Sequence, residues 1–428
     1  MRRMILACLL LASLAALAPS GAAAGTSVIG LRYWTAPDHT RIVIDLASPA
    51  TYTHRTMTGP HRIVVEIPGS RLADQARRVE VGDGLVDRIR TNALRSGTAQ
   101  VVVDLPEGPS YKIFSLKRYR NKPDRIVIDV MRPVAESERA AALRRVAELK
   151  ERNTAIVVID PGHGGEDPGA VAPGRVYEKD ITLKVCSELA RLLEKHPGVE
   201  VFLTRTGDYF VSLQKRQDIA REMRADLFLS VHTNAAPVRD ARGAEVFFLS
   251  MSGASDAAAR ALAEAENAAD RVGGVSTESQ GDIGAILCDL SREDALKRSS
   301  RLSEIVYDEL RESGLTRMRK VKQAGFAVLK TIQMPAVLVE LGFLSSPTDR
   351  KNLCRSAYQR DLAKALARSV RRYLELYPPG EGVVHVVARG ENLWRIARTH
   401  GTTVQDLKRL NHLDNADRIV VGQRLRVR

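Results

Sequence analysis

The chain has 428 residues, too many for one compact core, so two to four domains are expected. Its 65 Lys and Arg outnumber its 51 Asp and Glu, and the formal net charge of +14 favours an acidic partner. Because no module interleaves basic and aromatic residues, this charge argues against nucleic acid and for an anionic envelope polymer or a lipid surface.

Residues 1–25 have the features of an export signal. Arg2 and Arg3 precede an apolar run from Met4 to Pro19, and a small-residue site follows at Ala22-Ala23-Ala24. This pattern predicts a segment that is cleaved on secretion, and the arginine pair leaves the Sec and Tat routes both open. Since no later stretch is long and apolar enough to cross a bilayer, we expect a mature protein without a transmembrane segment, outside the cytoplasm.

Residues 26–133 repeat one hexad four times, beginning at Arg41, Arg62, Gln100 and Arg125. Each copy has β-branched residues at its centre and turn-forming residues beyond its ends, which predicts a strand. The region should therefore form an all-β sandwich or barrel. Because this region has no cluster of His, Cys or paired carboxylates with catalytic spacing, we expect it to serve in binding or positioning and not in catalysis.

Two breaks divide the rest of the chain. Residues 134–154 are rich in Ala, Glu, Arg and Leu without a broad apolar face, which is typical of an exposed helical linker. The sequence "YPPGEG" at residues 377–382 marks a second break. These breaks predict a middle domain at 155–377 and a short module at 383–428.

The middle domain alternates apolar strand patterns with helical ones, such as Asp180–Glu194. This alternation predicts an α/β domain whose mainly parallel sheet is covered on both faces. In such sheets, ligands bind beyond the carboxyl ends of the strands. The expected strands are Ile156–Ile159, Val199–Thr204, Leu227–Val231, Glu245–Leu249 and Ala336–Val339.

Four polar residues fall at this edge of the predicted sheet. His163, His232 and Glu340 each follow a strand, and Glu178 stands just before a helix expected to be capped near Asp180. Two imidazoles and one carboxylate form a common catalytic zinc set that leaves the fourth position for water, and Glu340 could then act as general base. Taken singly, each His is more simply a satisfied polar group, Glu340 could cap a helix, and the glycine-rich turn could hold a phosphate, although it lacks the P-loop lysine.

Five motifs then occur in order: "VVIDPGHGGEDPGA", "YEKDITL", "FLTRTGD", "SVHTNAA" and "MPAVLVELGFLSSPTD". Together they resemble the zinc-dependent N-acetylmuramoyl-L-alanine amidases of bacterial cell walls. The resemblance implies that His163, Glu178 and His232 bind one Zn²⁺ and that Glu340 is the catalytic glutamate. It also implies the substrate, the amide between N-acetylmuramic acid and L-alanine in peptidoglycan. Arg205 and Asn234 are expected nearby, with structural roles at least as plausible as catalytic ones.

Both flanking regions resemble modules that act on the same polymer. Residues 384–428 resemble a LysM module with a strand-helix-helix-strand order, and Trp394 and the leucines are expected in its core. The N-terminal β region is similar to the AMIN domain of periplasmic amidases. These likenesses imply peptidoglycan anchoring, a periplasmic location, and a role in cell-wall remodelling and daughter-cell separation.

Residues 250–298 form a longer connection than the predicted sheet requires. Ile283, Ile286, Leu287 and Leu290 follow a helical spacing, and a hinge-like "GGVSTESQG" precedes them. The stretch resembles the regulatory insertion of division-associated amidases, in which a helix covers the active site until a LytM-type activator displaces it. On this hypothesis Asp282, or else Glu278, reaches the open zinc position. A surface helix on the domain flank is the alternative.

Three cysteines remain beyond the signal, at 186, 288 and 354, and their sparse spacing favours buried thiols over a disulfide framework. Two other function classes also fit the motifs. A non-catalytic wall-binding scaffold would contain no catalytic zinc and would be unaffected by Glu340→Gln. A metallopeptidase would use the same zinc geometry on a peptide bond and would release different fragments from peptidoglycan.

Overall fold

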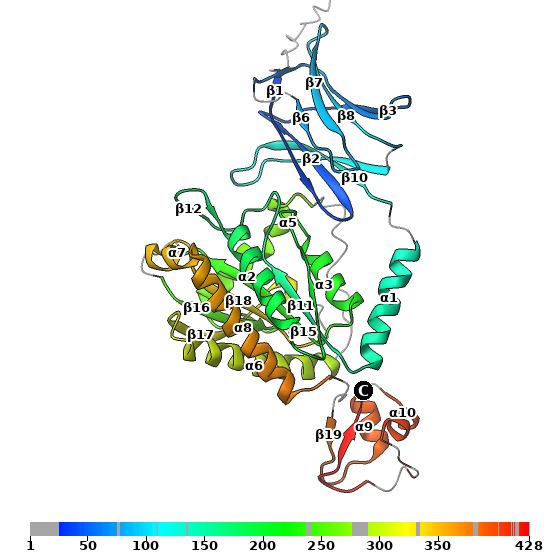
Figure 1. The fold of residues 1–428 in the computed structure, drawn as a ribbon, viewed down its shortest axis with the longest axis vertical. Helices are drawn as coiled ribbons and strands as arrows, with labels where there is room; N and C mark the ends of the chain where they lie inside the picture. Colours follow the sequence, from blue (N-terminus) through cyan, green and yellow to red (C-terminus); the bar gives the residue numbers. More distant parts are fainter. Residues whose placement is uncertain are drawn as a thin grey trace, which may run out of the picture.

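The computed structural model describes residues 25–427 apart from 75–77, 109, 134–135, 237–240, 276–289, 331–333, 380–383, 401, 412, 414 and 416–418. An all-β region, an α/β domain and a small C-terminal module follow one another along the molecule (Figure 1). This fold class is the one that the sequence predicted. The predicted export signal lies outside the described residues. None of the described helices combines the length and the apolar character that crossing a membrane requires.

The N-terminal region consists of two five-stranded sheets that pack face to face. The repeated hexads lie in β2, β4, β8 and β10, and their apolar side chains fill the space between the sheets. The prediction of an all-β region is confirmed, and of the two architectures left open, sandwich and barrel, the structure has the sandwich. The first sheet has the order β5-β1-β2-β10-β9 and the second β3-β4-β8-β7-β6. The strands are β1 (Thr26–Thr35), β2 (His39–Leu46), β3 (Thr53–Met57), β4 (Arg62–Ile67), β5 (Ser70–Leu72), β6 (Val79–Glu80), β7 (Arg88–Leu94), β8 (Thr98–Asp104), β9 (Ser110–Leu116) and β10 (Asp124–Met131).

The α/β domain is built on a six-stranded sheet of order β14-β11-β15-β18-β16-β17. The first four strands run parallel, and β16 is antiparallel to β18, so the sheet is mainly parallel as predicted. Edge strand β17, with the sequence MRKVKQA, was not predicted because it is mostly polar. The strands are β11 (Ala155–Pro161), β14 (Val199–Leu203), β15 (Leu227–Asn234), β16 (Ala244–Leu249), β17 (Met318–Ala324) and β18 (Ala336–Phe343), with a separate hairpin of β12 (Val171–Ala172) and β13 (Val176–Tyr177).

Helices cover both faces of this sheet. One apolar core lies under α2 (Glu178–Leu193), α6 (Leu290–Glu312) and α8 (Ser356–Leu376). The core on the other face includes side chains from α1 (Glu136–Glu151), α3 (Leu213–Glu222), α4 (Ala257–Asn267) and the 3₁₀ helix η2 (Ala327–Leu329). Two short helices, α5 (Ala269–Val272) and α7 (Pro347–Leu353), complete the domain.

Two expectations about individual residues of this domain were wrong. Helix α2 begins at Glu178 itself, after Tyr177, so the cap is not near Asp180. Cys186 is buried as expected, but Cys354 is exposed at the C-terminus of α7. Cys288 lies outside the described residues.

The C-terminal module has the predicted strand-helix-helix-strand order. Its elements are β19 (Val384–Val386), α9 (Leu393–Thr399), α10 (Val404–Leu410) and β20 (Arg424–Arg426). Leu393, Leu407 and Leu425 are buried in its core. Trp394 is not, because 62% of the residue is exposed and its ring lies against the guanidinium of Arg398.

Candidate metal centre and active site

The carboxyl edge of the parallel sheet gathers the predicted site residues. His163 follows the end of β11, and His232 and Glu340 stand opposite each other in register on the neighbouring strands β15 and β18. The rings of His163 and His232 meet edge to face, with centroids 4.9 Å apart. The expected spatial convergence is therefore present, although His232 and Glu340 lie within β15 and β18 and not beyond them, because both strands are longer than predicted.

The glycines around His163 make room for the other side chains of the site. A Cβ on Gly162 would lie 2.4 Å from the His232 ring, and a Cβ on Gly169 would lie 2.5 Å from Glu178 Oε2. His163 itself has φ +60°, in the left-handed region that is uncommon for residues other than glycine. Its Nδ1 lies 2.7 Å from Asp167 Oδ2, which orients the ring so that Nε2 faces the centre of the site.

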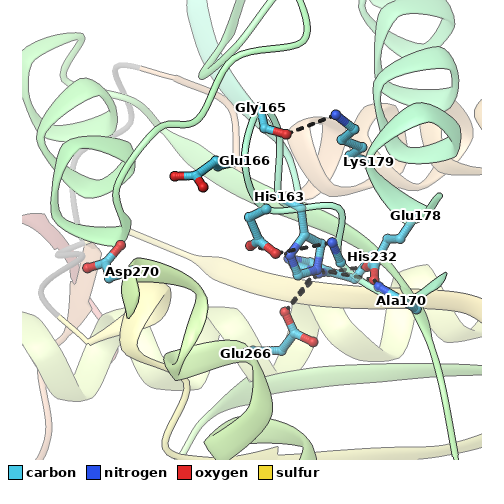
Figure 2. A network of polar contacts seen from close by, with 12 residues as sticks. His163, Gly165, Glu166, Ala170, Glu178, Lys179, His232, Glu266 and Asp270 are labelled. Atoms are coloured by element: carbon cyan, nitrogen blue, oxygen red, sulfur yellow. Dashed lines mark hydrogen bonds and ion pairs between the residues drawn. The ribbon is translucent and has the colours of Figure 1, made fainter. Parts of the chain in front are cut away.

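Glu178 faces both imidazoles from the first turn of α2. Its Oε2 lies 3.1 Å from His163 Nε2, and its Oε1 lies 3.1 Å from His232 Nδ1. Each oxygen also accepts a backbone hydrogen bond, Oε2 from Ala170 and Oε1 from Thr233, both at 2.8 Å. Loop, helix and strand therefore fix this carboxylate between the two rings (Figure 2).

A further carboxylate that the sequence analysis did not single out completes the centre. Glu266, near the end of α4, places Oε2 at 3.3 Å from His163 Nε2 and at 3.2 Å from His232 Nδ1. In Figure 2 it approaches the imidazoles from below. The remaining cavity here is about 10 Å³, barely the volume of one water molecule. This cavity is too small to hold a substrate in this conformation.

The geometry and charge of this constellation fit a divalent cation. A tetrahedral zinc ion with ligands at about 2.0–2.1 Å places its ligand atoms roughly 3.3–3.4 Å apart. The distances from the imidazole nitrogens to the Glu178 and Glu266 oxygens are 3.1–3.3 Å. Ligand atoms of His163, His232 and Glu266 also lie within 4.8 Å of one another.

The pKa shifts of these groups also indicate that the site favours a positive charge between the carboxylates. Burial alone would lower the pKa of His232, but Glu266 and Glu178 raise it to about 10. Burial alone would raise the pKa of Glu178, but His163 and His232 lower it to about 2. A bound cation would take the place of the protons that these imidazoles otherwise hold.

Glu340 is the remaining predicted residue, and it is wholly buried beside His232. Neither carboxylate oxygen has a hydrogen-bond partner among the described residues. Burial raises its pKa well above the ordinary value, although His232 opposes the shift. Glu340 lies within β18, three residues before its end, and a buried carboxyl group whose oxygens lack a partner among the described residues is a candidate proton carrier rather than a packing residue.

Arginines support the loop that carries His163. Arg205 donates to the carbonyl oxygens of Pro161 and Gly162, at 3.0 and 2.8 Å, which is the structural role considered from the sequence. Arg216, which the sequence analysis did not single out, pairs with buried Asp160 at 2.6 Å and donates to the His163 carbonyl at 2.8 Å. Asn234 is buried at the end of β15, and its carbonyl accepts from the Leu344 amide.

Comparison with known proteins gives the class of enzyme. A family model described as N-acetylmuramoyl-L-alanine amidase matches residues 157–372, and models of the AMIN and LysM domains match 30–130 and 385–428. The chain belongs to the N-acetylmuramoyl-L-alanine amidase family.

Individual relatives extend over most of the chain. It is 32% identical to the N-acetylmuramoyl-L-alanine amidase AmiC of Neisseria meningitidis, over 80% of this chain and 89% of the relative. It is 29% identical to the N-acetylmuramoyl-L-alanine amidase AmiC of Escherichia coli, over 82% of this chain and 90% of the relative. Among solved structures, an N-acetylmuramoyl-L-alanine amidase from Clostridium difficile 630 is 27% identical, covers 53% of this chain and 99% of its own, and has a TM-score of 0.41.

Proposed function

We propose that this chain is a zinc-dependent enzyme that hydrolyses the amide bond between N-acetylmuramic acid and L-alanine in peptidoglycan. The observation that carries the proposal is the convergence of His163, Glu178 and His232 next to buried Glu340, whose carboxylate has no hydrogen-bond partner within the described part of the chain. The family match and the AmiC relatives support the substrate. The export signal expected from the sequence, together with the AMIN domain match, supports a periplasmic location.

In this proposal His163, Glu178 and His232 hold one zinc ion. When bound, zinc polarises a carbonyl and lowers the pKa of water to about 7. Glu340 accepts a proton from the attacking water and delivers it to the departing amine. The water oxygen forms a bond to the lactyl carbonyl carbon and the C–N bond breaks, which leaves a carboxylate on the sugar and a free amino group on L-alanine.

The flanking modules serve the same polymer. We infer that the LysM-like module and the AMIN-like sandwich hold the enzyme on peptidoglycan, and the net charge of +14 suits an anionic wall. Cell-wall remodelling and daughter-cell separation follow as the cellular role.

The test is analysis of the products released from purified peptidoglycan. The active wild-type protein should release intact stem peptides with L-alanine at the amino end. Glu340→Gln should lower this rate by about 10²- to 10⁴-fold while zinc content stays at one per chain. A different amino-terminal residue would indicate a peptidase, and the absence of both zinc and product would indicate a scaffold.

We further propose that the described conformation is an autoinhibited state in which Glu266 takes the position that water and substrate need. The proximity of Glu266 Oε2 to both imidazoles and the cavity of about 10 Å³ support this role. Asp282 and Glu278, the residues expected to block the site, lie outside the described residues. Glu266 belongs to the same predicted insertion, and we propose it as the blocking residue. A LytM-type activator would release the site by moving α4.

Glu266→Ala tests this role. We expect the variant to hydrolyse purified sacculi roughly 10- to 100-fold faster than the wild-type protein without activator, because the resting state loses its fourth ligand. Glu264→Ala is the matched control, since Glu264 is an exposed carboxylate on the same helix. Equal basal rates for the wild-type protein and a well-folded Glu266→Ala variant would exclude autoinhibition by this residue.

A further inference from the structure

The N-terminal sandwich contacts the turn that follows the Glu266 segment. Arg41 on β2 donates from Nη1 to the carbonyl oxygens of Gly273 and Gly274, at 2.5 and 3.2 Å. Arg125 on β10 donates from Nη1 to the Val272 carbonyl at 3.3 Å. Figure 1 shows β2 and β10 directly above α5. Two cations of one domain thus bind the carbonyl groups of residues 272–274, at and just beyond the C-terminus of the short helix α5 in the other domain.

A buried carboxylate joins the same contact from the catalytic side. Glu166 has a fully buried side chain, and its Oε1 lies 2.7 Å from Arg125 Nη1 and 3.1 Å from Arg32 Nη2. Lys122 Nζ donates to the Glu166 backbone carbonyl at 2.6 Å. In Figure 2 the Glu166 side chain points away from the imidazoles. Its charge therefore serves the domain interface, not the metal centre.

The turn between these groups leaves no room for larger side chains. Gly274 has φ +79°, and a Cβ there would lie 2.9 Å from Leu116 Cδ1 of the sandwich. A Cβ on Gly273 would lie 2.2 Å from the Phe210 ring of the catalytic domain. The two glycines are thus packed between the domains, and small side chains are needed for that fit.

The contact is close to Glu266 along the chain. Glu266 lies one residue before the end of α4 at Asn267, and only Asn267, Ala268 and α5 (Ala269–Val272) separate it from Gly273. Moving α4 outward therefore strains either α5 or the contacts of the turn. A cavity of about 750 Å³, lined by Arg41, Phe114, Phe210 and Gly274 among others, lies beside these contacts and leaves space for them to open.

We propose that the N-terminal sandwich is an intramolecular latch on the catalytic domain. The latch consists of Arg41, Arg125 and Lys122 on the sandwich, with Glu166 and the carbonyl groups of residues 272–274 on the catalytic domain. While closed, it holds the carboxyl end of the α4–α5 segment and so keeps Glu266 on the imidazoles. This inference rests on the proposed blocking role of Glu266 and gives the sandwich a regulatory function in addition to wall binding.

The test is Arg41→Gln in the full-length zinc-loaded protein. Hydrogen–deuterium exchange of peptides covering residues 257–275 should accelerate roughly tenfold, and basal hydrolysis should rise roughly fivefold, because charged hydrogen bonds to the turn are lost. In a Glu266→Ala background Arg41→Gln should add nothing to the rate, since the latch acts through Glu266.

Arg90→Gln is the matched control. Arg90 pairs with Asp104 through Nε and Nη2 at 2.7 and 2.8 Å, much as Arg41 pairs with Asp129 at 2.7 Å through the same two atoms, but it lies on the other sheet. Lys122→Gln is the second test variant, because Lys122 lies in a turn outside the core of the sandwich. If Arg41→Gln unfolds the sandwich, Lys122→Gln serves as the test in its place. It should accelerate amide exchange and raise the basal rate in the same direction as predicted for Arg41→Gln.

The outcomes separate the two proposals. If Glu266→Ala leaves the basal rate unchanged, autoinhibition by Glu266 is wrong. If Glu266→Ala raises the rate but folded Arg41→Gln and Lys122→Gln proteins match the wild type in exchange and rate, the latch is wrong. A rate increase with Arg41→Gln that persists undiminished in the Glu266→Ala background also contradicts the latch.

Discussion

Helices α2 and α4 each carry one carboxylate to the same pair of imidazoles, yet they are attached to the domain very differently. Among the buried residues of α2 are the large aliphatic side chains Ile181, Val185, Leu189 and Leu193. The buried residues of α4 are Ala259 and Ala263. Burying a large aliphatic side chain contributes about 1.5–3 kcal/mol, and burying an alanine methyl contributes much less.

The two carboxylates differ in the same way as the helices that carry them, Glu178 being firmly held and Glu266 weakly held. Backbone amides of Ala170 and Thr233 hold Glu178 in place, whereas Glu266 meets the imidazoles from a helix with a small apolar contact. One helix therefore builds the site and the other can leave it without unfolding the domain. At Asn267, α4 is attached by two hydrogen bonds: the side-chain amide donates to the Gly325 carbonyl and accepts from the Ala327 amide. A partner protein could offer equivalent hydrogen bonds to this amide group.

Truncating the core of α2 should have the largest effect. Leu189→Ala removes a fully buried side chain and should lower the free energy of unfolding by about 3 kcal/mol, measured by urea denaturation. Leu262→Ala on α4 is the control and should cost about 1 kcal/mol or less, because Leu262 is partly exposed. Equal losses would break the distinction between the two helices.

The orientation of His163 gives the next effect. Asp167→Asn replaces the carboxylate that contacts His163 Nδ1 and should weaken zinc binding by about 10- to 100-fold, measured by competition with a chelator. Asp361→Asn, on an exposed carboxylate of α8 that pairs with Lys364, is the control. Unchanged zinc affinity in Asp167→Asn would remove Asp167 from the metal centre.

Zinc removal should affect the two helices unequally. After chelation, amide exchange in α4 should accelerate roughly tenfold while exchange in α2 stays as it was, because Glu178 keeps its backbone donors. Mass spectrometry of peptides from both helices measures this directly. Equal acceleration in α2 and α4 would contradict the separate roles assigned to them.

The smallest effect is expected from weakening α4 alone. Ala261→Gly, at an exposed position in the middle of α4, should destabilise the helix by about 1 kcal/mol and raise basal hydrolysis about fivefold. Ser187→Gly at an exposed position of α2 is the comparison and should not raise the rate. A rate increase in both variants would indicate general loosening of the domain.

Strand periodicity allowed the sheet, the sandwich hexads and the convergence of His163, His232 and Glu340 to be predicted, because apolar strands and their ends are recorded locally in the sequence. Glu266 could not be singled out in the same way. It lies in "ALAEAENAAD" beside Glu264, and only the packing of α4 decides which carboxylate faces the imidazoles. Polar β17 and exposed Trp394 were missed because tertiary contacts, not local pattern, determine them.

The most direct test of the metal centre is anomalous diffraction at the zinc edge from crystals of the full-length protein. We predict one peak within about 2.0–2.3 Å of His163 Nε2, His232 Nδ1 and an oxygen of Glu178, with Glu266 as the fourth ligand. A zinc peak elsewhere, or one from which either imidazole or Glu178 lies several ångströms away while α4 keeps its position, would contradict the account.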